Sequence, residues 1–92
     1  MFTISCSDSV VQDLQEAAKI ATSIPSKIEE LSVTPLANAI PIEVPYAPQY
    51  YVNAGRFCIL FNIDPTTSDV EIIRVVSNAY LYKVITRRIT FI

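Results

Sequence analysis

Residues 50–61 read YYVNAGRFCILF, and this stretch predicts two strands joined by a tight turn at Gly55. Side chains alternate along a strand, so Phe57, Ile59 and Phe61 point to one face of the sheet, while Cys58 and Leu60 point to the other. A strand with one solvated face should alternate apolar and polar residues. Because the second strand is apolar on both faces, we expect each side of the sheet to be covered.

Two helices are predicted before this stretch, and together they cover one of the two faces. The first runs from about Ser9 to Thr22, with Ser9 and Gln12 forming a capping box. Its apolar residues recur at helical spacing: Val10, Val11, Leu14, Ala17, Ala18 and Ala21. A second helix, from Pro25 to about Ser32, buries Ile24, Ile28 and Leu31. A partner is therefore expected to cover Cys58 and Leu60 on the other face.

The remaining elements complete a small α+β fold. A short strand is expected within Met1 to Cys6, and three antiparallel strands are expected at about Gln49 to Ala54, Phe57 to Ile63 and Val70 to Val76. Four prolines between Pro35 and Pro48 predict an extended, ordered surface connection. The tail from Ser77 to Ile92 fits a helix or a strand. The predicted fold is a helical hairpin packed on one face of a small, mainly antiparallel sheet, in a single domain of residues 1–92.

Composition excludes several kinds of site. The chain has 92 residues, a formal net charge of −2 and no histidine. The charge argues against strong nonspecific binding to nucleic acid, and the missing histidine excludes Ser-His-Asp, Cys-His and histidine–metal sites within the chain. Two cysteines, Cys6 and Cys58, are too few for a zinc site, so we predict no metal or cofactor. They are interpreted as thiols of a cytoplasmic protein, with one disulfide as the alternative.

No membrane or export segment is predicted. No apolar run approaches the roughly 20 residues that a membrane span needs. No basic segment precedes an apolar stretch at the start of the sequence, so a signal peptide is not expected.

The order of elements and the local sequence resemble the RelE/ParE toxin superfamily. Residues 50–61 are similar to the family pattern of an aromatic-basic-aliphatic strand, a glycine turn and an aromatic-Arg-Ile-Leu-aromatic strand. Val70 to Val76 resembles the next strand, and residues 79–83, AYLYK, resemble the closing segment. The resemblance spans about Met1 to Lys83. It implies a prokaryotic toxin of a type II toxin–antitoxin system, which acts on ribosome-bound messenger RNA in the RelE branch and on DNA gyrase in ParE-like members.

The sequence departs from the RelE branch where that branch carries its basic residues. The strand position usually held by arginine is Cys58, the basic positions of the preceding strand are Tyr51 and Asn53, and the basic run after the last strand reads Ser77, Asn78, Ala79. Each lost donor to a developing phosphate charge costs about two to three powers of ten in rate. The resemblance therefore implies a degenerate member with little nuclease activity.

Candidate site residues follow from this comparison. Tyr82 resembles the tyrosine near the end of the family's chains, and the resemblance implies that it is the candidate catalytic residue; from the residues alone, the favoured interpretation is a packed aromatic at the end of a strand. The predicted binding residues are Tyr51, Arg56, Cys58, Leu60, Lys83 and Arg87. Arg74 lies inside an apolar strand, where it can pair with Glu71 or Asp69 or project onto the partner face. We expect the pairing, because an unpaired buried charge is costly.

Three functions are consistent with these residues. The favoured one is a toxin-like protein that binds an antitoxin-like partner or forms a homo-oligomer and does not cleave RNA. The second is a RelE-like, ribosome-dependent endoribonuclease that uses Tyr82, Lys83, Arg56 and Arg87. The third is a small structural or adaptor domain that self-associates.

Overall fold

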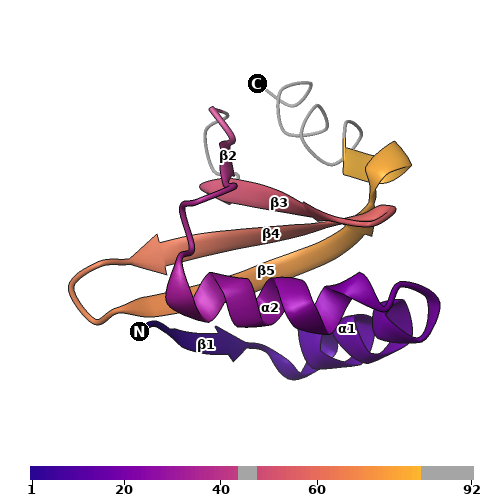
Figure 1. Ribbon diagram of the computed structural model, residues 1–92, viewed down its shortest axis with the longest axis horizontal. Coiled ribbons are helices and arrows are strands. Elements are labelled where there is room, and N and C mark those ends of the chain that lie inside the picture. The colour runs from indigo at the N-terminus through magenta and orange to yellow at the C-terminus, as the bar shows by residue number, and fades with distance from the viewer. Residues whose placement is uncertain (44–47, 82–92) are drawn as a thin grey trace.

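The computed structural model describes residues 1–43 and 48–81, and it places two helices against one face of a five-stranded sheet (Figure 1). The elements, in chain order, are β1 (Thr3–Cys6), α1 (Asp8–Ile20), α2 (Ser23–Val33), β2 (Ile40–Pro41), β3 (Tyr50–Ala54), β4 (Phe57–Asp64) and β5 (Asp69–Ser77). The strand order is β1-β5-β4-β3-β2, and only the β1–β5 pair is parallel. The predicted α+β class is confirmed, and each predicted element is present within two residues of its expected ends.

The first helix begins one residue earlier than predicted, and its cap differs. Ser7 is the N-cap, and its side chain makes no capping hydrogen bond. Its Oγ instead lies 3.1 Å from Ser9 Oγ. The predicted capping box of Ser9 and Gln12 is therefore wrong, since Ser9 lies inside the helix.

The main core lies between the helices and one face of the sheet. Apolar residues of both helices pack against alternating residues of β3, β4 and β5. The buried members are Val10, Ala17, Ile24, Leu31, Val52, Ala54, Ile59, Phe61, Val70 and Ile72. Phe61 also stacks on Tyr50 of the neighbouring strand, with ring centroids 5.8 Å apart. The predicted helical hairpin on one sheet face is confirmed.

Gly55 forms the β3–β4 turn, as predicted, and two features require glycine there. Its φ is 65°, in the left-handed region that side chains with a Cβ rarely adopt. A Cβ at this position would lie 3.0 Å from Ser23 Oγ at the start of α2. The turn is therefore packed directly against the helical hairpin.

The connection from α2 to β3 contains a short edge strand that the sequence did not predict. Ile40 and Pro41 of β2 pair with Tyr51 and Tyr50 of β3. Proline is confined to sheet edges because it lacks a backbone N–H, which fits the position of β2. None of the helices in the described ranges is long and apolar enough to cross a membrane.

Two amide side chains extend the pairing of β3 with β4. The backbone N–H of Gln49 donates to Asn62 Oδ1 at 2.7 Å, and the backbone N–H of Ile63 donates to Gln49 Oε1 at 2.9 Å. These bonds fix the chain where it enters β3.

Candidate functional site on the second sheet face

The face of the sheet opposite α1 and α2, called the second face here, collects most of the predicted site residues that the structure describes. Tyr51 and Asn53 of β3 pair with Leu60 and Cys58 of β4, and those two pair with Arg74 and Val76 of β5. Partners that lie directly opposite in a sheet point to the same side. The six side chains therefore share one surface.

A β-bulge puts Arg74 on this surface. The register changes from Leu60↔Arg74 to Phe61↔Ile72, which leaves Ile73 without a partner. Unbroken alternation from Val70 and Ile72 would direct Arg74 into the helix-side core. The extra residue reverses the phase, so Arg74 is exposed and Val75 packs against the helix-side core instead.

The second face has its own small core in the single chain. Cys58, Leu60 and Val76 are only 1%, 0% and 7% exposed, and Ile42, Tyr51 and Leu81 pack against them. The prediction that a partner must cover Cys58 and Leu60 is therefore wrong. Apolar side chains from the chain itself cover them, including Ile42 from the connection after β2 and Leu81, four residues after β5.

A neutral polar cluster lies beside this core. Cys58 Sγ lies 2.8 Å from Asn78 Oδ1 and 3.3 Å from Asn53 Oδ1, so the thiol donates to an amide oxygen. Asn78 Nδ2 in turn donates to the backbone oxygen of Gly55 at 3.4 Å. Burial raises the pKa of the Cys58 thiol. The thiol is therefore protonated at neutral pH and is a poor nucleophile. Both described cysteines are free, as the thiol interpretation predicted.

Two arginines supply positive charge around the second face. Arg56 is exposed in the β3–β4 turn, and Arg74 is exposed on β5. The predicted pairing of Arg74 with Glu71 or Asp69 is wrong: within the described ranges, the ion pair present is Lys27–Glu30, at 2.9 Å. Glu71 lies three residues before Arg74, about 10 Å along an extended strand. Because Arg74 reaches solvent, it needs no internal partner.

Three predicted site residues, Tyr82, Lys83 and Arg87, lie outside the described residues. Sequence reasoning missed the roles of Asn53 and Asn78 as hydrogen-bond partners of Cys58. Asn53↔Cys58 is a cross-strand pair set by the turn at Gly55, so that contact was readable from the hairpin register. Asn78 directly follows β5, which ends at Ser77, and no local signal in the sequence predicts its contact with Cys58.

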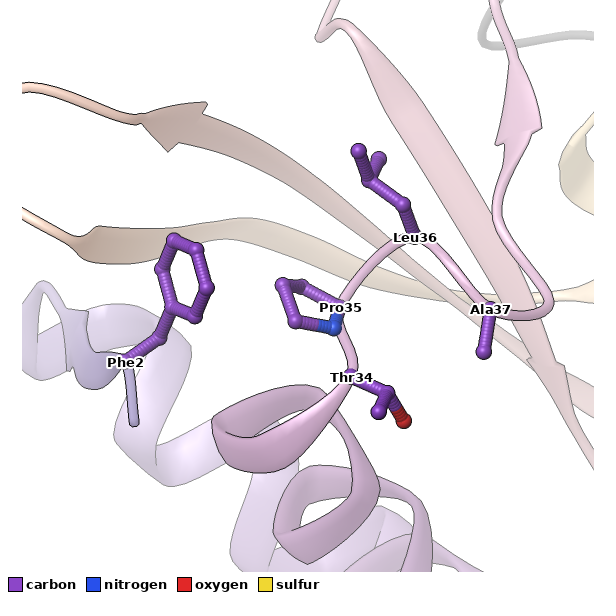
Figure 2. A pocket seen from close by; sticks show the side chains of 5 residues that line it. All are labelled: Phe2, Thr34, Pro35, Leu36 and Ala37. Carbon is purple, nitrogen blue, oxygen red and sulfur yellow. The ribbon is translucent and has the colours of Figure 1, made fainter.

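A shallow apolar pocket lies away from this surface, where α2 ends and β1 begins. It has a volume of approximately 440 Å³ and is lined by Phe2, Thr34, Pro35, Leu36 and Ala37. Figure 2 shows the ring of Phe2 and the side chains of Pro35 and Leu36 around this space. The pocket presents no charged side chain, and the sequence did not predict it.

Comparison with known proteins places the fold. No model of a protein family matches the sequence, and no curated protein matches it. Among solved structures, a chain from the crystal structure of the toxin–antitoxin complex RelBE2 of Mycobacterium tuberculosis is similar, with a TM-score of 0.65 and 23% sequence identity. The match covers 84% of this chain and 98% of that chain. The chain therefore has a RelE-like fold, as the sequence resemblance implied.

Proposed function

We propose that this protein is the toxin-like component of a type II toxin–antitoxin system and that it acts by binding protein, with the residues for RNA cleavage largely lost. The proposal depends on the neutral Asn53–Cys58–Asn78 cluster on the second face. The fold is RelE-like, and the cluster occupies positions where the resemblance implies basic side chains.

The chemistry of these side chains is poorly suited to phosphodiester cleavage. Cleavage at a ribose needs a base to activate the hydroxyl and positive charge to stabilise the phosphate. The sequence has no histidine, and the Cys58 thiol stays protonated because burial raises its pKa. Amide side chains carry no net charge, so Asn53 and Asn78 stabilise a developing anion less than arginine does.

The same surface suits a protein partner. Arg74 is exposed on β5, on one side of the buried Leu60, and the half-buried Tyr51 lies on β3, on the other side; Arg56 is exposed in the β3–β4 turn. Tyrosine and arginine are enriched where protein interfaces gain most of their binding energy. We propose that an acidic antitoxin segment contacts Tyr51, Arg56 and Arg74, and that Lys83 and Arg87 add positive charge to the same contact. In this arrangement Cys58 and Leu60 hold Tyr51 in place and do not themselves touch the partner.

Co-expression with the product of the adjacent open reading frame tests this proposal. Size-exclusion chromatography should show a stable complex that Arg56→Glu and Arg74→Glu weaken. Lys19→Glu, an equal charge reversal at an exposed position of α1, is the matched control and should leave the complex intact. A complex that tolerates both arginine reversals would contradict the proposed surface.

The RelE-like fold keeps the nuclease as a second candidate. That function would use Tyr82, Lys83, Arg56 and Arg87, and expression should then arrest growth with messages cut on ribosomes. Tyr82→Phe should abolish the arrest. Growth arrest without message cleavage would instead support a target such as gyrase, reached by protein binding.

A further inference from the structure

The strand at one end of the sheet, β1, has an open edge. The backbone N–H of Thr3 donates to the oxygen of Ser68 at 2.9 Å, which sets the phase of the parallel β1–β5 ladder. In such a ladder every second residue directs both backbone groups to its neighbour, so Thr3 and Ser5 face β5. Ile4 and Cys6 face outward, and no other described residue accepts or donates a backbone hydrogen bond there.

The two ends of the sheet differ in how they are protected. Natural sheets protect their edges with prolines, charges, bulges or a covering element. At one end, β2 is two residues long and includes Pro41. At the other end, β1 reads TISC, with neither a charge nor a proline. The end of α2 meets this edge at Phe2, whose N–H donates to the oxygen of Ser32 at 2.7 Å.

The side chains of β1 are self-complementary. Ile4 and Cys6 are half-buried at the border of the helix-side core, while Thr3 and Ser5 are exposed on the second face. An antiparallel copy of the same strand would therefore meet apolar side chains on one face and hydroxyl groups on the other. It would bring no like charges together.

We propose that β1 pairs antiparallel with β1 of a second copy of this chain, with Ser5 opposite Ser5 of the second copy on a two-fold axis. Outward-facing residues must meet outward-facing residues, so Ile4 pairs with Cys6 of the second copy and exchanges two hydrogen bonds with it. The symmetric pair repeats this exchange, and the four outward N–H and C=O groups of each copy are satisfied. A register centred on Ile4 would instead require the N–H of Phe2, which Ser32 already engages.

The contact is isologous and closes at two copies. It uses the outer backbone edge of β1, whereas the antitoxin contact proposed above uses side chains of the second face. Of these side chains Arg74 lies on β5, the neighbour of β1, but beyond the stretch from Asp69 to Ile72 that pairs with β1. The paired segment is short, so the dimer belongs to the class of small, weak interfaces.

Charge variants of the exposed residues of β1 test the register. Ser5→Glu places two carboxylates opposite each other on the axis, and two such charges should weaken the dimer about ten- to hundredfold. Thr3→Glu is the matched control. Thr3 is also exposed, and it lies beside Asp69 as Ser5 lies beside Glu71. In the proposed dimer, however, Thr3 faces an uncharged serine of the second copy. Sedimentation from about 1 µM to about 1 mM should show dimers for the wild type and Thr3→Glu.

The same measurement on mixed variants separates pairing from misfolding. An equimolar mixture of Ser5→Glu and Ser5→Lys chains should restore the dimer as a heterodimer. A wild type that stays monomeric throughout, or a dimer that Ser5→Glu leaves unchanged, overturns the proposal. A strand from a different protein that binds β1 of a monomeric wild type overturns it equally.

Cross-linking gives an independent measurement of the register. In a Cys6→Ser background, Ser5→Cys places two thiols in a non-hydrogen-bonded pair, where Cα atoms lie about 4.5 Å apart and disulfides form. Mild oxidation should link these chains. Thr3→Cys chains should stay unlinked, because Thr3 lies two residues from the axis and the two introduced thiols are four residues out of register. Equal cross-linking of the two variants would contradict the proposed register.

Discussion

Replacing Leu60 with alanine should lower the free energy of unfolding by about 3 kcal/mol. Leu60 is 0% exposed and belongs to the small core of the second face. Truncating a buried leucine costs about 2 to 5 kcal/mol, depending on how far the site collapses. Among the residues that the structure describes, this core has two other buried members, Cys58 and Val76, so the cost should fall below the upper end of that range. The free energy of unfolding of a 92-residue domain is roughly 5 to 14 kcal/mol. The loss caused by Leu60→Ala is therefore a large fraction of the total stability.

Urea unfolding, followed by far-ultraviolet circular dichroism at a concentration where the chain is monomeric, measures this loss. Leu36→Ala is the matched control, because it removes the same atoms from a side chain that is 56% exposed. It should cost less than about 1 kcal/mol. If Leu60→Ala costs no more than Leu36→Ala, the second face is not packed within the single chain, and the reasoning from its burial fails.

Two further predictions concern the turn and the thiol. Gly55→Ala should destabilise the fold by about 1 to 2 kcal/mol, because alanine is strained at positive φ and its Cβ would crowd Ser23 Oγ. The same change in a Ser23→Ala background should cost less. An equal cost in both backgrounds would show that the crowding is unimportant. Stability should fall as the pH rises above about 8.5, because burial raises the pKa of Cys58 in the folded chain and unfolding then releases its proton. Cys58→Ser should remove this part of the pH dependence, and an unchanged pH profile in that variant would assign the effect to other groups.

The helix-side half of the fold was predictable because its signals are local. Apolar residues at helical spacing identified α1 and α2, and the glycine at position 55 fixed both the β3–β4 turn and its register. The ends of the elements shifted by one or two residues. The capping box failed because Ser7 precedes Ser9 and takes the N-cap position.

The second face was harder to predict because its structure depends on contacts between distant residues. The bulge at Ile73 reverses the phase of β5, and alternation alone would have placed Arg74 in the core. Burial of Leu60 depends on Ile42 and Leu81, which lie 18 residues before it and 21 residues after it. Residues 57–61 are apolar on both faces of the strand, and this pattern correctly predicted that both faces are covered. It did not predict that the chain covers both faces itself.

Message cleavage on purified ribosomes tests the central functional claim most directly. Wild-type protein is expected to leave ribosome-bound messenger RNA intact even at a large excess over ribosomes, because its second face presents the neutral Asn53–Cys58–Asn78 cluster. Cleavage within codons that Tyr82→Phe abolishes would contradict this account and assign the protein to the RelE-like nucleases.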